Sequence, residues 1–167
     1  MARLAEDLLD TARIGSGKLD LARRAVDLRT TIASAIEMTR AQVERREQTL
    51  TSEVGRAPVM VEGDCGRLVQ IVANLIDNAA RYTPYGGQIT VGLAVTACLA
   101  IVEVRDTGIG LPASALESIF SPFVQVPDAS AFDAGGLGLG LALVRSLTEF
   151  HDGTVHATSA GAGQGSG

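Results

Sequence analysis

Hydrophobic and polar positions along this chain switch several times between helical and strand spacing. Apolar residues at helical spacing predict helices over residues 1–13, 28–47, 65–82 and 138–150, with a short one near 114–119. Alternating or continuous apolar runs predict strands over residues 24–28, 48–54, 58–62, 88–96, 98–105 and 153–159. Strands and helices that follow one another in this way predict a layered domain with helices packed on a sheet.

The helix predicted over residues 65–82 has the clearest amphipathic pattern. Its apolar side chains recur at the i, i+3, i+4 and i+7 spacing of one helix face, from Leu68 to Ala79. Asp64 precedes it at the position of a capping residue, and Asp27 stands in the same place before the helix that starts after it. We therefore expect the helix over 65–82 to lie on a sheet.

Composition narrows the class of protein. Of the 167 residues, 46% are hydrophobic and 4% aromatic, with no Trp, so the core is aliphatic. The 14 basic and 19 acidic residues give a net charge of −5 without a cluster of Lys or Arg, which argues against a nucleic-acid-binding surface.

Two isolated Cys residues fit a reducing cytosol. No apolar run approaches the ~20 residues of a membrane helix, and no signal peptide is present, so we expect a cytoplasmic domain. This expectation is compatible with a longer parent protein that is anchored in a membrane.

Two Asn side chains stand four residues apart on the helix over 65–82. At about 100° per residue, Asn74 and Asn78 point within about 40° of each other, and Arg81 lies one turn beyond Asn78. Amide oxygens are hard ligands suited to Mg²⁺, and a guanidinium is suited to phosphate. The pattern therefore indicates a site for magnesium and phosphate. The alternative is an Asn pair that only solvates the edge of the helix.

A carboxylate follows the strand predicted over residues 98–105, at the start of a glycine turn. Asp106 precedes Gly108 and Gly110, which let the backbone turn sharply and approach a ligand closely. A carboxylate accepts hydrogen bonds only, so it matches the exocyclic amino group of adenine and not the carbonyl of guanine. The alternative is an Asp-x-Gly turn that only ends a strand.

Three glycines alternate with Leu at the start of the helix predicted over residues 138–150, at Gly136, Gly138 and Gly140. Bare backbone N–H groups and the positive end of the helix dipole make an anion site there, for which phosphate is the natural occupant. The spacing fits neither the GxGxxG dinucleotide fingerprint nor a P-loop, since no third Gly falls in register and no Gly-Lys-Ser/Thr follows. The alternative is a glycine hinge without a ligand.

Four segments, in this order, resemble the N, G1, F and G2 boxes of the sensor histidine kinase ATP-binding domain: Asn74-Leu-Ile-Asp-Asn78-Ala, Asp106-Thr-Gly-Ile-Gly110, Phe120-Ser-Pro-Phe123 and Gly136-Leu-Gly-Leu-Gly140-Leu. The resemblance covers nearly the whole chain. It implies an α+β fold, a two-layer α/β sandwich of the Bergerat ATP-binding type. In that fold, helices cover one face of a mixed, mostly antiparallel sheet, and a mobile lid, here residues 121–137, closes on ATP.

The resemblance also implies roles for particular residues. Asn78 would bind Mg²⁺, Asn74 and Arg81 would be the catalytic groups at the phosphates, Tyr82 would neighbour adenine, and Asp106 would take its amino group. The cofactor-binding residues that the resemblance implies are Asn74, Asn78, Arg81, Tyr82, Asp106, Gly108, Ile109, Gly110, Gly136, Leu137, Gly138, Leu139, Gly140 and Leu141.

The family reaction is in-line transfer of the γ-phosphoryl group of ATP to a His nitrogen, achieved mainly by positioning and charge neutralisation. Residues 1–23 resemble the end of the dimerisation and phosphotransfer helix with its linker, residues 24–160 the catalytic domain, and residues 161–167 a flexible tail truncated before the final strand. The implied partners are ATP or ADP, the dimerisation and His-phosphotransfer domain of the same homodimeric parent and, indirectly, the receiver domain of a response regulator.

Several positions depart from the family pattern. The chain has no phosphoacceptor box, and we expect His151 and His156 to be structural. The stretch 111–144 contains no Lys or Arg, although family lids often carry one near the γ-phosphate. Leu137 stands where Thr is usual, and Asp152 stands where Gly is common.

Two other kinds of protein share this fold. An ATPase-coupled conformational machine would carry a Glu general base one turn before the magnesium ligand, where this chain has Asn74. A non-catalytic ATP-sensing or protein-binding module is the other alternative, and the lid without basic residues is its support.

Overall fold

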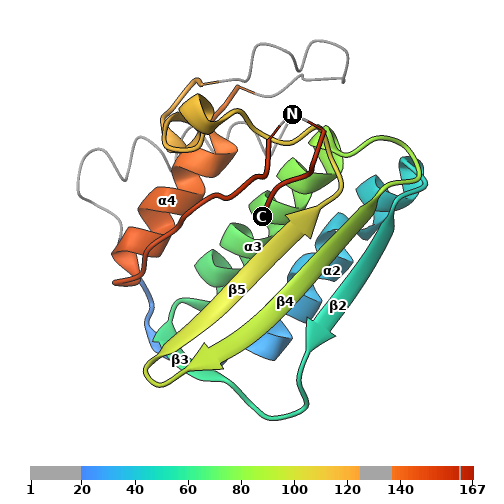
Figure 1. Cartoon of the computed structure of the whole chain (residues 1–167). Coiled ribbons are helices and arrows are strands. Elements are labelled where there is room, and N and C mark those ends of the chain that lie inside the picture. The colour runs from blue at the N-terminus through green and yellow to red at the C-terminus, as the bar shows by residue number, and fades with distance from the viewer. Residues whose placement is uncertain (1–19, 125–136, 162) are drawn as a thin grey trace.

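A computed structural model describes residues 20–124, 137–161 and 163–167 of the chain. Two short 3-10 turns, η1 (Ala113–Ala115) and η2 (Ser118–Phe120), lie between the last strand and the last helix. The other elements, in chain order, are β1 (Arg24–Asp27), α2 (Leu28–Arg45), β2 (Thr49–Val54), β3 (Met60–Gly63), α3 (Cys65–Tyr82), β4 (Gln88–Thr96), β5 (Leu99–Asp106) and α4 (Gly140–Phe150). In Figure 1, α2 and α3 lie behind the sheet and α4 lies beside α3.

The main sheet has the strand order β2-β4-β5. β2 runs parallel to β4, and β4 runs antiparallel to β5 with Ile89 opposite Asp106. β1 and β3 form a separate antiparallel pair. This mixed, mostly antiparallel arrangement, with helices on one side, confirms the predicted α+β sandwich.

The core lies between α2, α3 and the inner face of the sheet. Side chains at helical spacing on the two helices meet alternate side chains of the strands, and a fully buried residue such as Ile76 contributes about 1.5–3 kcal/mol. The buried set comprises Ile32, Ala35, Val43, Val72, Ala73, Ile76, Ala79, Ala80, Ile89 and Val91. The amphipathic pattern of residues 65–82 therefore places α3 on the sheet as predicted.

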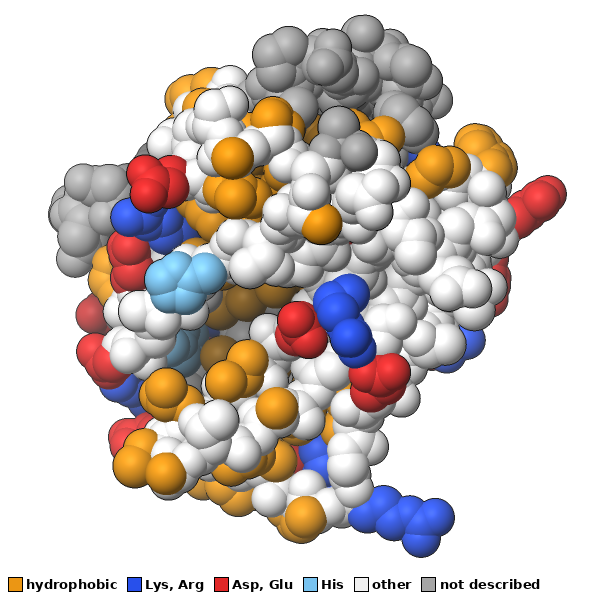
Figure 2. Space-filling model, viewed as in Figure 1, with side chains coloured by type: hydrophobic (Ala, Val, Ile, Leu, Met, Phe, Trp, Pro, Cys, Tyr) orange, Lys and Arg blue, Asp and Glu red, His pale blue; other side chains and the backbone are white. Residues whose placement is uncertain are grey.

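The other face of the sheet is open and largely polar. On it, Arg105 forms ion pairs with Glu53 and Glu103, and Figure 2 shows charged side chains gathered there. Leu99 and Ile101, near the turn between β4 and β5, are exposed hydrophobic residues. Among the described residues, no helix is long and apolar enough to cross a membrane.

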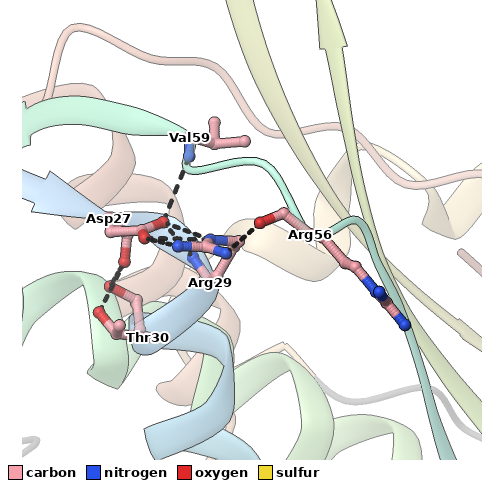
Figure 3. A network of polar contacts seen from close by, with 6 residues as sticks. Asp27, Arg29, Thr30, Arg56 and Val59 are labelled. Carbon is pink, nitrogen blue, oxygen red and sulfur yellow. Dashed lines mark hydrogen bonds and ion pairs between the residues drawn. The ribbon is translucent and has the colours of Figure 1, made fainter.

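The start of α2 is fixed by a network of polar contacts around Asp27 (Figure 3). The Asp27 carboxylate caps the helix by accepting from the backbone N–H of Arg29, and it also accepts from the N–H of Val59 at 3.2 Å. The Arg29 guanidinium donates to the same carboxylate and to the carbonyl of Arg56. These side-chain hydrogen bonds from Arg29 lower the pKa of Asp27 to about 2. The network joins α2 to the segment between β2 and β3.

Several elements differ from the sequence-based expectations. No strand forms over residues 153–159, all of which the structure describes, because a strand needs a hydrogen-bonded neighbour. Here only Thr158 exchanges two backbone hydrogen bonds, with Gly167. The helix predicted near 114–119 is the pair of 3-10 turns, and the helix predicted over 1–13 lies outside the described residues.

The last residues of the chain fold back onto the end of β5. Gly163 donates to the carbonyl of Ile109, Gly165 donates to that of Gly108, and Asp106 donates to that of Ser166. This differs from the flexible tail expected over residues 161–167.

Candidate functional site

α3 carries a polar line on the side opposite the core. By helix geometry, Asn74, Asn78 and Arg81 lie about 140–160° around the helix from the buried Ile76. Asn74 is nevertheless only 7% exposed, and Asn78 and Arg81 are half-buried. The polar line is therefore partly enclosed, which is compatible with a ligand site.

Asp106 lies at the end of β5 with both carboxylate oxygens engaged. Its Oδ1 accepts from the backbone N–H of Gly108 at 2.7 Å, and its Oδ2 accepts from the hydroxyl of Ser166. Each oxygen has a second lone pair, so a donor on a ligand can still be accepted. The carboxylate is held in one orientation by partners from two segments.

The turn after Asp106 packs against the last residue of α3. The N–H of Ile109 donates to the carbonyl of Tyr82 at 3.1 Å. A Cβ on Gly108 would lie 2.5 Å from that carbonyl oxygen, so only Gly allows this approach. Gly110 has φ +67°, a conformation that favours Gly. Asp106, Gly108, Ile109 and Tyr82 are thus brought together at the C-terminal end of α3.

The glycine-rich segment leads into the start of α4. Gly138 has φ +69°, and its carbonyl accepts from the N–H of Phe123 at 3.0 Å, which joins the two ends of the expected lid. α4 begins at Gly140, and no described side chain caps its first turn. The first N–H groups of α4 have no partner within the helix, and the predicted anion site would use them.

The Leu residues of this segment take different positions. Leu139 is buried, Leu141 is half-buried and Leu137 is 44% exposed. Gly136 and most of the lid predicted over 121–137 lie outside the described residues. α4 packs against α3, and its start lies at the same end of the molecule as the end of α3 (Figure 1).

Ser166 is a site residue that sequence reasoning missed. It lies 60 residues after Asp106 in a Gly-rich tail, and nothing in that composition indicates an ordered contact. Gln48 was missed as well: its side-chain amide donates to the carbonyls of Ala80 and Thr83 at the end of α3. Ser166 could have been found by predicting that the C-terminal tail pairs with the end of β5.

The donor set fits an adenine nucleotide with Mg²⁺. Mg²⁺ takes few protein oxygens and completes its shell with phosphates and water. The amide oxygen of Asn78 would be such a ligand. The guanidinium of Arg81 has no ion-pair partner in the described part of the chain, so its charge is available to an anion.

Comparison with known proteins agrees with this geometry. A family model described as histidine kinase-, DNA gyrase B-, and HSP90-like ATPase matches residues 63–167. The adaptive-response sensory kinase SasA of Thermosynechococcus vestitus is 36% identical over 160 residues, which are 95% of this chain and 42% of that protein. The chain thus spans less than half the length of this relative.

Two solved structures are similar in fold. Full-length ShkA in complex with AMPPNP has a TM-score of 0.83 and 28% identity, over 98% of this chain and 34% of that one. Histidine kinase ThkA in complex with response regulator protein TrrA has a TM-score of 0.75 and 21% identity, over 99% of this chain and 46% of that one.

Proposed function

The chain belongs to the family of histidine kinase-, DNA gyrase B- and HSP90-like ATPases, as the ATP-binding domain of a sensor histidine kinase, and we propose that it donates the γ-phosphoryl group of ATP to a His of its parent protein. One observation carries this proposal. The hydrogen bond from Ile109 to Tyr82 fixes the Asp106 carboxylate at the end of the helix that carries the two Asn side chains. This arrangement supports the proposal that one nucleotide would contact Asp106 with its base and the two Asn side chains with its phosphates.

The nucleotide would lie along α3 from its C-terminal end. Asp106 would accept from the adenine amino group, with Tyr82 beside the base. Eight residues separate Tyr82 from Asn74, which is about 12 Å of helix, enough for ribose and phosphates to follow. The phosphates would then lie near Asn78 and Asn74.

Positioning and charge account for the transfer step. Asn78 would hold Mg²⁺, which when bound neutralises charge on the phosphate oxygens. Arg81 would donate to phosphate oxygens, and the N–H groups at the start of α4 would donate to oxygens of the same anion. Asn74, one turn from Asn78, would orient the terminal phosphate toward the acceptor. Asn74 and Arg81 are therefore our candidates for the catalytic residues.

The acceptor and the further partners belong to the parent protein. We propose a dimerisation and His-phosphotransfer domain, joined through residues 1–23, in a homodimeric parent with its kinase domain in the cytoplasm. ThkA was solved with response regulator protein TrrA, and we propose a receiver domain of that class as the eventual recipient of the phosphoryl group.

Radiolabelled transfer tests the proposal. The chain is mixed with γ-labelled ATP, Mg²⁺ and a separately produced dimerisation domain from the parent, and we expect label on the acceptor His. The control with the acceptor His→Gln variant should remain unlabelled, and this chain with Asp106→Asn should label the acceptor more weakly when ATP is below saturation. Nucleotide binding without any label would contradict the kinase proposal and would support an ATP-sensing module.

A further inference from the structure

The chain enters the domain through a joint between three segments. It comprises Ala22 and Arg23 of the incoming chain, Asp64 at the start of α3, and Phe150, His151 and Asp152 at the end of α4, and we call it the linker joint. In Figure 1 the incoming chain, drawn in blue, meets the C-terminal end of α4. The proposed nucleotide site uses the opposite ends of both helices.

Arg23 binds the C-terminal end of α4. Its Nη2 donates to the carbonyl of Phe150 at 2.6 Å, and its Nη1 donates to the Asp152 carboxylate at 2.7 Å. The last carbonyls of a helix have no partner within the helix and carry the negative end of its dipole. A guanidinium is therefore well matched to this end of α4.

Asp152 adopts a backbone conformation that favours Gly. Its φ is +59°, and residues other than Gly, Asn and Asp rarely take this conformation just after a helix. Gly would adopt this backbone conformation at lower cost than Asp, so the backbone alone does not favour an Asp side chain at position 152. The contact that this side chain makes is with Arg23.

Stability alone does not explain this ion pair. The side chains of Arg23 and Asp152 are 38% and 78% exposed, and exposed ion pairs contribute little to folding. The Arg23–Asp152 contact is better explained by a role in positioning the incoming chain against α4.

Asp64 connects the same incoming chain to α3. One carboxylate oxygen caps the helix by accepting from the N–H of Arg67, and the other accepts from the N–H of Ala22 at 3.0 Å. Burial raises the pKa of Asp64, but these N–H groups outweigh it and hold the pKa below its ordinary value, so the group is charged as the cap requires. The linker is therefore bound to the N-terminus of α3 as well as to the end of α4.

His151 completes the joint between the two helices. Its Nε2 accepts from the backbone N–H of Asp64 at 3.0 Å, so Nδ1 carries the proton and donates to the carbonyl of Leu147 at 2.7 Å. A Cβ on Gly63 would lie 2.8 Å from the ring, so the ring is closely packed. The start of α3, the end of α4 and the incoming chain are thus joined by hydrogen bonds.

We propose that Arg23 is a positioning residue, which, through Asp152 and the linker joint, sets the orientation of the ATP-binding domain relative to the preceding phosphoacceptor domain. The inference rests on the proposed function. α3 and α4 run from the joint to the proposed phosphate-binding groups, which are Asn74 and Asn78 on α3 and the start of α4, so a small rotation at the joint would displace the γ-phosphate relative to the acceptor. An acceptor supplied separately finds its own orientation and does not depend on the joint.

Two variants remove the same contact in different ways. Arg23→Gln removes the cation, and Asp152→Gly removes the anion while relieving the backbone. Each is tested for transfer within the parent kinase, for transfer from this chain to a separate acceptor domain, and for ATP affinity. Arg24→Gln is the matched control, because it makes the same charge change one residue later, at an exposed side chain for which no ion pair is found among the described residues.

The expected result is a difference between the two transfer reactions. In both variants, transfer within the parent falls by about tenfold, because misplacement of reacting groups is costly. Transfer to the separate acceptor and ATP affinity stay within about twofold of the unmodified protein, and Arg24→Gln changes none of the three. Asp152→Gly melts at the same temperature as the unmodified chain or higher.

Two outcomes would overturn the inference. One is unchanged transfer within the parent for both variants. The other is a parallel loss of ATP affinity and of both transfer reactions, which would assign the joint a purely structural role. Failure of the proposed function is a separate observation: the unmodified chain would then bind no ATP or label no acceptor.

Discussion

The hydroxyl of Ser166 donates a hydrogen bond to Oδ2 of Asp106, while the N–H of Gly108 donates to Oδ1 of the same carboxylate. A carboxylate held from two sides cannot rotate to suit a different base, so its remaining lone pairs select a donor. The next residue, Ile109, donates its N–H to the carbonyl of Tyr82 in the last turn of α3. In the proposed function, base selection and phosphate binding would therefore depend on one connected set of hydrogen bonds.

Replacing the carboxylate by an amide should weaken nucleotide binding. In Asp106→Asn one oxygen becomes an NH₂ group, which opposes either the N–H of Gly108 or the amino group of adenine. We expect ATP affinity to fall by about 1 to 3 kcal/mol, measured by calorimetry. Glu103→Gln, the same change at an exposed position of β5, is the control and should bind normally. A loss below about 0.3 kcal/mol at Asp106 would show that the carboxylate does not read adenine.

Removing the hydroxyl of Ser166 should have a smaller effect through the same carboxylate. In Ser166→Ala we expect ATP affinity to fall by about 0.5–1.5 kcal/mol, the value of one hydrogen bond. In combination with Asp106→Asn, the losses should not add, because both act on one group. Full additivity in the double variant would contradict the role given to Ser166.

Adding a methyl group at Gly108 should disrupt the turn. The Cβ of Gly108→Ala would lie 2.5 Å from the carbonyl oxygen of Tyr82 and from Oδ1 of Asp106, so the turn must shift. We expect a loss of ATP affinity of at least about tenfold and a lower melting temperature. Gly92→Ala on β4 is the control, since nothing lies within 4 Å of its Cβ. Equal behaviour of the two variants would rule out the close packing at Gly108.

The network at Asp27 should make stability depend on pH in the acid range. The side-chain hydrogen bonds from Arg29 lower the pKa of Asp27 from 3.8 to about 2 in the folded chain. A lowered pKa stabilises the fold above about pH 4, and this stabilisation disappears as the pH falls through about 2. Asp27→Asn keeps a capping side chain but not the charge. We expect its melting temperature to lie below that of the unmodified chain at pH 5–7 and to equal it near pH 2; a difference that does not vary with pH would contradict this account.

Much of this fold was predictable because its helices and strands have strong local signals. The pattern of residues 65–82 and the caps at Asp27 and Asp64 set where α2 and α3 begin. The N-box amides and the Asp106 turn were predictable for the same reason, since each occupies a few consecutive residues.

Contacts between distant segments were not predictable in the same way. The segment 153–159 alternates like a strand, but whether it becomes one depends on a neighbouring strand. Ser166 reaches Asp106 only because the Gly-rich tail turns back along β5. The role of Asp152 depends on Arg23, which lies 129 residues earlier in the chain. In each case the partner is brought close by the tertiary structure, and the residues near it in the sequence do not indicate it.

The most direct test of the central claim is calorimetric titration of the folded chain with Mg-ATP and with Mg-GTP. The account predicts binding of Mg-ATP in the micromolar range or tighter, about −8 kcal/mol or better, and affinity for Mg-GTP weaker by at least about tenfold. The reason is that the fixed carboxylate of Asp106 accepts from the amino group of adenine and repels the carbonyl of guanine. No heat with either nucleotide, or equal affinity for both, would contradict the account.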